Sequence, residues 1–342
     1  MWRLVSNARG PWPNLSQVDR LSQQDLLHIY DAFDETVLGD ILISKGYPAH
    51  VFQDSYTFYQ GNFPCQFWCA DLWLGTELAK FADVERNDVE TKYAANFIIN
   101  KKQINRFLAI KLVEYFEIDC HYTWSGVDAN FDMSGIINEL KLLPDHKIPT
   151  AAVSWMLSPI KTAPRWIDHP AQKSGGFGIT NYGTNRWTWD NGIGKIVSGS
   201  AVSLITESQR FEKAIHFSEK TAYAMLGQTF PIWIGGYRQA QEWEKLGFDV
   251  FHDVIDHSYQ FYDTLIQRCW HAFADNSKLL TDLNKLARVR EKMSARLQDN
   301  FNRVTDNIVR NHNQKIIAAW PDHVKNAIKP IVSTFFQNHL LE

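Results

Sequence analysis

A strand–helix–strand pattern in residues 94–126 constrains the fold of this chain more than any other feature. The run NFII (96–99) is typical of a buried strand, KKQIN of a polar turn, and RFLAIKLVEYF has apolar residues at helical spacing. A second apolar run, IDCHYTW, follows as another strand. Units of this kind build a parallel sheet flanked by helices, so the pattern predicts an α/β fold.

The same alternation returns after residue 200. SAVSLITE (200–207) predicts a strand, SEKTAYAMLGQ a helix that starts near Ser218, and FPIWIGG another strand. YRQAQEWEKLGF then predicts a helix, and DVFHDVI (249–255) a last short strand. Together these elements predict a Rossmann-like sheet between about 94 and 255.

Three regions follow from the composition along the chain. The polar segment ERNDVETKY (85–93) marks a boundary, so residues 1–90 form one expected domain, 91–275 the Rossmann-like domain and 276–342 a helical tail. Within the first region, SQQDLLHIYDAF (22–33) has helical spacing, whereas residues 51–69 are aromatic and typical of a loop or strand. Residues 127–190 predict a helix and long loops that carry four tryptophans, Trp155, Trp166, Trp187 and Trp189.

The tail predicts an amphipathic helix of several turns. Apolar residues recur there at steps of three and four from Leu280 to Ile308, and Pro321 interrupts the pattern before a final helix. From Asn276 onward there are 11 basic and 6 acidic residues, within a chain of net charge −3. A solvated helix face explains this excess, and contact with nucleic acid, an anionic membrane or an acidic partner is the alternative.

Composition excludes several other classes of protein. No apolar run approaches the roughly 20 residues that span a bilayer, and the N-terminus lacks the apolar region of a signal peptide, so we expect a soluble, cytoplasmic protein. The four cysteines do not suggest a disulfide framework. Cys65 and Cys69 lack a second pair for zinc, which favours buried reduced thiols. The 13 Trp and 21 Phe need a thick core, and aromatic rings left over from a core often line pockets for flat or sugar-like ligands.

The segment HFSEKTAYAMLGQTFPIWIGG (216–236) contains an unusual pair of charges. Ser218 can cap the helix, and Glu219 in the first turn suits the helix dipole. Lys220 does not, because a cation is disfavoured at a helix N-terminus. A lysine there is explained if a negatively charged ligand shares the site, and a neighbouring carboxylate could accept hydrogen bonds from a ribose diol.

The order of elements around this segment resembles a known signature. The run SLITESQRFEKAIHFSEKTAYAMLGQTFPIWIGG is similar to the donor-binding region of the α-1,3-fucosyltransferase-type glycosyltransferases and of uncharacterised relatives, including phage ones. The upstream unit NFIINKKQINRFLAIKLVEYF is similar as well, and the resemblance covers about 94–126 and 200–255. The matching positions are Asn100, Arg106, Thr206, Glu207, Ser208, His216, Ser218, Glu219, Lys220 and the strand from Pro231 to Gly236.

The resemblance implies a GT-B architecture, in which two Rossmann-like domains face each other across a cleft and the C-terminal one binds a nucleotide-diphosphate sugar. It implies that Glu219 binds the ribose hydroxyls and that Lys220 and Arg106 neutralise the diphosphate leaving group. His216, where the family has an aromatic residue, would lie beside the nucleotide. Fixed cations stabilise such a leaving group without a metal, so we expect an inverting, metal-independent hexosyl- or pentosyltransferase that needs no other cofactor.

The sequence leaves the general base open. The family's acceptor-domain carboxylate motif is absent from residues 1–90, where the aspartates are candidates only by position, namely Asp31, Asp34, Asp54 and Asp71. Three further segments favour ordinary structural interpretations: DANFD (128–132) as a solvated loop, GGFG (175–178) as a flexible lid, and HDVIDH (252–257), in which nothing completes a metal-ligand set.

Two kinds of acceptor hydroxyl fit these features. One is a glycan or lipid-linked saccharide, and the other is a hydroxymethylated DNA base, as in phage DNA modification, which the enzyme would have to extrude from a duplex. The alternative to a transferase is a non-catalytic protein that binds a nucleotide or nucleic acid through a degenerate donor site.

Overall fold

The computed structural model divides the chain into two compact units. One contains residues 1–73, 209–218 and 307–342, and the other contains residues 74–208 and 219–306. The structure describes residues 90–99, 103–123, 137–138, 148–161, 193–207 and 217–305, together with the backbone of four short strands between residues 3 and 66.

The larger unit is built on a parallel sheet. Its four strands are β5 (Tyr93–Ile98), β6 (Cys120–Thr123), β7 (Ser200–Ile205) and β8 (Phe230–Trp233), in the order β6-β5-β7-β8. Every neighbouring pair is parallel. All six residues of β7 and all four of β8 are buried, as expected where helices cover both faces of a sheet. The four strands predicted from the apolar runs are confirmed.

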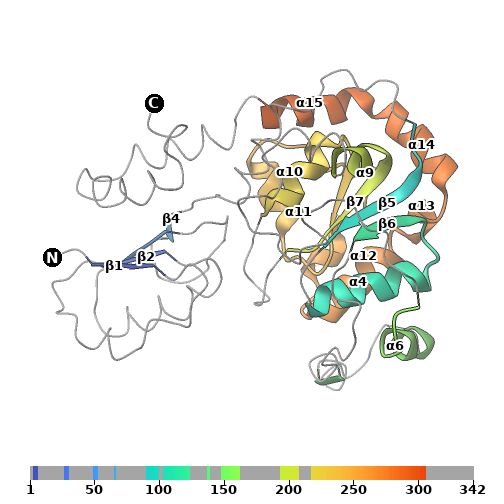
Figure 1. Ribbon diagram of the computed structural model, residues 1–342, viewed down its shortest axis with the longest axis horizontal. Helices are drawn as coiled ribbons and strands as arrows, with labels where there is room; N and C mark the ends of the chain where they lie inside the picture. Colours follow the sequence, from blue (N-terminus) through green and yellow to red (C-terminus); the bar gives the residue numbers. More distant parts are fainter. Residues whose placement is uncertain are drawn as a thin grey trace, which may run out of the picture. The chain divides into compact units, whose positions relative to one another are not determined.

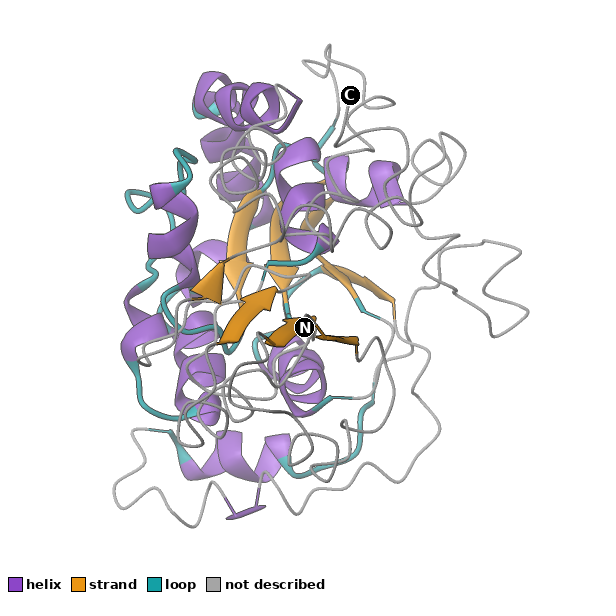
Figure 2. Cartoon of the chain, turned by 90° about the vertical axis from the view of Figure 1, so that its left-hand side faces the viewer, coloured by secondary structure: helices purple, strands orange, loops and turns teal. Residues whose placement is uncertain are grey.

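Helices lie on both faces of this sheet (Figure 1). On one face, α4 (Ile104–Tyr115) packs against α6 (Thr150–Met156) and α12 (Leu265–Ala274). On the other, α10 (Glu219–Leu226) packs against α9 (Gly194–Ser198) and α15 (Ser294–Thr305). Figure 2 shows these helices on both sides of the strands from a second direction. The α/β fold class and the helices predicted between the strands are therefore confirmed.

The basic C-terminal segment begins as part of this same core. The predicted amphipathic spacing is right, because Leu280, Leu286, Leu297 and Phe301 are all buried. The single long helix is wrong, since the segment forms α13 (Ser277–Leu280), α14 (Leu283–Lys292) and α15. Asp282 explains the first break, because its side chain accepts the Lys285 N–H and so starts a new helix.

Residues 249–255 do not form the predicted last strand. After α11 (Gln239–Lys245), the chain makes a turn in which the N–H groups of Val254 and Ile255 both donate to Phe251 O. Phe251 has φ +60, and its N–H donates to Asp249 Oδ1 at 2.8 Å. Asn300 of α15 takes the place of a neighbouring strand, since its amide group bonds both Asp249 N and Asp249 O.

The other unit contains a second parallel sheet, of order β1-β2-β3-β4. The strands are β1 (Arg3–Ser6), β2 (Leu27–Tyr30), β3 (Ala49–Phe52) and β4 (Cys65–Gln66). The helical spacing in residues 22–33 is therefore misleading, because Leu27–Tyr30 pairs with strands on both sides. The aromatic and β-branched residues of LHIY suit a strand, and the pairing outweighs the helical period.

The expectations for the cysteines and for the tryptophan-rich region can be compared with the structure only in part. Cys120 and Cys269 are buried free thiols, whereas Cys65 and Cys69, for which buried thiols are predicted, have side chains outside the described residues. Trp155 lies in α6, where its indole N–H donates to Lys111 O at 3.1 Å. The rest of the tryptophan-rich region, the segments 128–132 and 175–178, and the side chains of residues 1–89 lie outside the described residues.

Candidate functional site

The strand order places the candidate site at one edge of the sheet. The chain passes from β5 outward to β6 on one side and from β7 outward to β8 on the other, so the order reverses between β5 and β7. In open parallel sheets, ligands bind beyond the carboxyl ends of the strands at such a point. We call this side the carboxyl edge. It receives the start of α4, the end of β7, the start of α10 and the turn after β8.

The start of α4 is tied to the end of β7. Asn105 donates its amide N–H to Glu207 O at 3.0 Å, and its Oδ1 accepts the backbone N–H of Arg106 at 3.0 Å. Both Asn105 and Arg106 are buried. The first turn of α4 is therefore held against β7 at the reversal point, with an arginine inside it.

Glu207 is connected in turn to α10 and β8. The hydroxyl of Thr221 donates to Glu207 Oε1 at 3.0 Å and accepts the indole N–H of Trp233 at 3.0 Å. All three residues are buried, so each bond is shielded from water. The ends of two neighbouring strands and the first turn of α10 thus share one chain of hydrogen bonds.

Glu219 and Lys220 form an ion pair in the first turn of α10. Lys220 Nζ lies 2.6 Å from Glu219 Oε1, and the two side chains are 16% and 22% exposed, respectively. Burial opposes ionisation of Glu219, but the charge and hydrogen bond of Lys220, with a smaller contribution from the charge of Arg106, hold its pKa below the usual value. Glu219 is therefore a carboxylate at neutral pH, within the field of two cations from different helices.

The turn after β8 closes the same edge. Gly235 has φ +75, and a Cβ there would meet Leu265 Cδ1 at 2.6 Å and Asn105 Cβ at 3.6 Å. Its carbonyl accepts Nε of the buried Arg268 at 2.9 Å. Glycine is needed here both for the left-handed backbone and for the close approach of the turn to Leu265 and Cys269 of α12, whereas Asn105 of α4 lies at van der Waals contact.

The structure thus brings four of the predicted site residues to one edge, namely Arg106, Glu207, Glu219 and Lys220. Ser218, the residue before α10, is buried. Asn100, Ser208 and His216 lie outside the described residues. The sequence interpretation gave no role to Asn105, Thr221 or Trp233, although Asn105 and Thr221 adjoin Arg106 and Lys220, and Trp233 lies within the named strand Pro231 to Gly236.

Comparisons with models of protein families, with curated proteins and with solved structures give no match to this chain. The functional argument therefore depends on the residues of the chain themselves. None of the helices in the described ranges is long and apolar enough to cross a membrane. Within the same ranges, no three His, Cys, Asp or Glu side chains gather as a metal ion would require.

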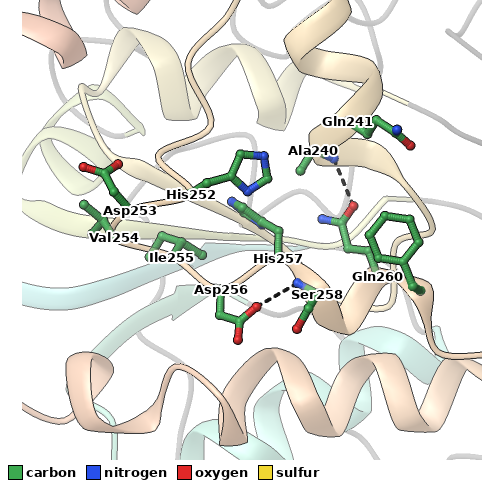
Figure 3. Close-up of a pocket in the computed structure, with 11 residues that line it drawn as sticks. Ala240, Gln241, His252, Asp253, Val254, Ile255, Asp256, His257, Ser258 and Gln260 are labelled. Atoms are coloured by element: carbon green, nitrogen blue, oxygen red, sulfur yellow. Dashed lines mark hydrogen bonds between the residues drawn. The ribbon is translucent and has the colours of Figure 1, made fainter.

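A groove of about 520 Å³ lies beside the start of α11 (Figure 3). Its walls are the first residues of α11, the turn after Phe251 and the 3₁₀ helix η4 (Ser258–Phe261). Gln260 holds the walls together, because its Oε1 accepts Ala240 N at 3.0 Å. The lining residues are Ala240, Gln241, His252, Asp253, Val254, Ile255, Asp256, His257, Ser258, Gln260 and Phe261.

His257 connects the groove to the carboxyl edge. Its ring centroid is 5.9 Å from that of Trp233, the residue that bonds Thr221. Its Nε2 lies 2.9 Å from Val250 O, and since a carbonyl only accepts, Nε2 carries the proton and Nδ1 is an acceptor. Burial lowers the pKa of His257 to about 4, so the ring is neutral at pH 7. The segment HDVIDH (252–257), interpreted as structural from the sequence alone, supplies six of the eleven residues that line this groove.

Proposed function

We propose that the β5–β8 unit binds a nucleoside-diphosphate sugar and that the chain is a glycosyltransferase acting on a hydroxyl acceptor. The observation that carries the proposal is the meeting of Arg106, Glu219 and Lys220 at the point where the strand order reverses. In a glycosyl transfer, the bond between the sugar and the diphosphate breaks and negative charge accumulates on the departing phosphate. Lys220 and Arg106 are the cations placed to stabilise that charge.

The position of Lys220 supports this role. A cation in the first turn of a helix is disfavoured by the helix dipole, and here Glu219 compensates for it at 2.6 Å. A diphosphate at the same helix end would offer Lys220 a stronger partner and would itself be favoured by the dipole. Glu219, ionised and partly exposed, would then accept hydrogen bonds from the two ribose hydroxyls.

The remaining contacts would keep these groups in place. Asn105 fixes the turn that carries Arg106, and Thr221 joins Glu207 to Trp233 across the start of α10. Groups held in position before the reaction stabilise charge without further rearrangement. A parallel sheet in the other unit supports the further proposal that the chain has the two α/β domains of a GT-B enzyme. The acceptor would be either a glycan or a hydroxymethylated DNA base.

The test is nucleotide binding by the wild-type chain and two variants. UDP, GDP, CMP and their sugars are titrated by calorimetry, and we expect one nucleotide to bind. Lys220→Met should weaken it roughly 10- to 100-fold, the value of one hydrogen bond to a charged group. Glu219→Gln should have a smaller effect, because the ribose hydroxyls keep an amide partner.

Lys245→Met is the matched control. Lys245 also pairs with a glutamate in a helix of this unit, Glu242 at 2.5 Å, but it lies in the last turn of α11. Its substitution should leave nucleotide affinity unchanged. If no nucleotide binds, or if the Lys220 and Lys245 variants bind equally well, the proposal is wrong. Where a donor binds, release of the nucleotide on adding an oligosaccharide or hydroxymethylcytosine DNA identifies the acceptor.

A further inference from the structure

We infer that the groove beside α11 is a saccharide-binding site. Its place in the fold is the first reason. The groove is lined by His257, whose ring adjoins Trp233, and Trp233 is linked through Thr221 to Glu207 at the carboxyl edge. A ligand that extends from the proposed nucleotide site along this edge would meet the groove. Assigning the saccharide to a transfer reaction rests on the proposed function, whereas the groove's affinity for a sugar ring does not.

The polar groups of the groove suit hydroxyl groups. Asp256 is exposed, and its carboxylate bonds only Ser258 among the described residues. Burial opposes its ionisation, but hydrogen bonds from Ser258 hold its pKa below the usual value. The exposed Gln241 makes no hydrogen bond to a described residue, so its amide can both donate and accept. The groove lining thus includes a carboxylate and an amide, both of which bind hydroxyl groups.

An aromatic face completes the set. Phe261 keeps 55% of its surface exposed at the rim of the groove, although Arg238 lies 5.9 Å from its ring centroid. An exposed aromatic ring beside hydroxyl-binding groups offers a flat apolar surface to the C–H face of a sugar ring. Arg238 has φ +55, an unusual conformation for a residue other than glycine that is found disproportionately at ligand sites.

A buried acceptor gives the groove a second, independent sign of a ligand. His257 is 3% exposed, and its Nδ1 has no hydrogen-bond partner among the described residues. Figure 3 shows the ring beside that of His252, and their centroids lie 5.4 Å apart at nearly a right angle. Leaving an acceptor buried and unbonded is costly, and a ligand hydroxyl that displaces the adjoining lining would satisfy it.

The charges of the groove disfavour the other ligand classes. Asp253 is neutralised by Arg296, with contacts of 2.7 and 2.9 Å, whereas Asp256 has no basic partner within ion-pair distance among the described residues. The groove therefore presents one uncompensated carboxylate, which repels phosphate and carboxylate ligands. A neutral, hydroxyl-rich ligand is the class that its lining fits.

The experiment compares two probes on the full chain. Calorimetry gives the affinities of UDP, GDP and their glucose and mannose conjugates, and saturation-transfer NMR detects methyl glycosides and oligosaccharides. The variants are Asp256→Asn, which keeps the oxygen that accepts Ser258 N, and Phe261→Ala. The controls are Asp263→Asn and Leu157→Ala, an exposed aspartate and an exposed apolar residue that do not line the groove.

Two results would support the groove and distinguish the source of its ligand. If the sugar belongs to the donor, the nucleotide sugar binds about tenfold more tightly than the matching diphosphate, and the groove variants lose that increment but keep the diphosphate affinity. If it belongs to the acceptor, both variants lose the saturation-transfer signal of a free saccharide. In either case, the controls should behave like the wild type.

The groove proposal is overturned if neither groove variant changes any sugar-dependent signal. Failure of the proposed function gives a different result. In that case no nucleotide binds the wild-type chain, but the wild type still binds a free saccharide and the groove variants do not. Thermal melting of each variant checks folding, and the exposed positions of Asp256 and Phe261 predict little change.

Discussion

The two edges of the β5–β8 sheet hold their arginines in different ways. At the amino edge, Arg290 of α14 donates to Gln228 O and Gly227 O at 3.0 Å and to Thr91 Oγ1 at 3.2 Å. All three acceptors are neutral. At the carboxyl edge, Arg106 lies close enough to Glu219 to lower the pKa of that carboxylate. The first arrangement joins the end of α10 to α14. The second places Arg106 near the Glu219–Lys220 ion pair at the N-terminus of α10.

Under the proposed function, the amino edge serves stability and the carboxyl edge serves ligand binding. A guanidinium that bonds neutral oxygens gains from every contact in the folded chain and offers little to an incoming anion. A cation placed near a partly exposed carboxylate and a second cation retains its attraction for a phosphate. Substitutions at the amino edge should therefore lower stability alone, and those at the carboxyl edge should lower affinity.

Arg290→Met should have the largest effect on stability. Three hydrogen bonds from a charged donor are lost, at about 1.5 kcal/mol each, so the free energy of unfolding should fall by about 4.5 kcal/mol. Denaturant unfolding measures the change, and calorimetry should find the nucleotide affinity of the folded variant unchanged. Arg296→Met is the control, because Arg296 is 37% exposed and its pairs with Asp249 and Asp253 are worth about 1 kcal/mol or less. A weakened nucleotide affinity in the Arg290 variant would remove the distinction between the two edges.

Much of the larger unit could be predicted from local sequence. The runs NFII and SAVSLITE are apolar because both faces of their strands are covered, and the helix RFLAIKLVEYF follows from its apolar spacing. Segment 249–255 could not be predicted, because its turn depends on Asn300, about 50 residues away, which occupies the place of a neighbouring strand. Leu27–Tyr30 likewise forms a strand despite its helical spacing, because it pairs with a parallel strand on each side.

The residues of the candidate site also fall into those that could be predicted from the sequence and those that could not. Glu219, Lys220 and Arg106 could be named because a lysine at a helix N-terminus is electrostatically unexpected and the surrounding elements have a recognisable order. Asn105 carries no such signal, since its bond to Glu207 joins residues 102 positions apart. The groove was missed because its lining comes from α11, a turn and η4, which meet only in the folded chain.

A pH titration of stability tests His257, at the carboxyl edge. Burial lowers its folded-state pKa to about 4, from 6.5 in the unfolded chain. Between these values the unfolded state binds more protons, so the stabilising contribution is complete above pH 6.5 and falls with pH until about 4. The loss amounts to about 3 kcal/mol. His257→Gln keeps a donor for Val250 O and should remove the pH dependence of the unfolding free energy between about pH 4 and pH 6.5. His252 is exposed, so His252→Gln should leave that dependence unchanged. Equal slopes in both variants would contradict the assignment.

The smallest predicted effect compares two glycines at opposite edges. Gly235 and Gly247 both have left-handed backbones, with φ +75 and +90, so alanine costs about 1 to 2 kcal/mol at either position from the backbone alone. A Cβ at Gly247, at the end of α11, would meet only the mobile end of Arg303 within 3.0 Å. At Gly235 it would meet Leu265 Cδ1 at 2.6 Å and Cys269 Sγ at 3.2 Å, so the turn must move away from α12.

Gly247→Ala should therefore lose about 2 kcal/mol of unfolding free energy and Gly235→Ala at least as much, but only Gly235→Ala should also weaken nucleotide binding. The reason is geometric, because the Gly235 turn also contacts Asn105, which supports the turn that carries Arg106, so a shifted β8 turn disturbs a cation at the carboxyl edge. Denaturant unfolding and nucleotide calorimetry on the same two samples provide the comparison. If Gly235→Ala keeps full nucleotide affinity, the contact of the β8 turn with Asn105 serves the fold alone, and the positioning of Arg106 must depend on the bond from Asn105 to Glu207.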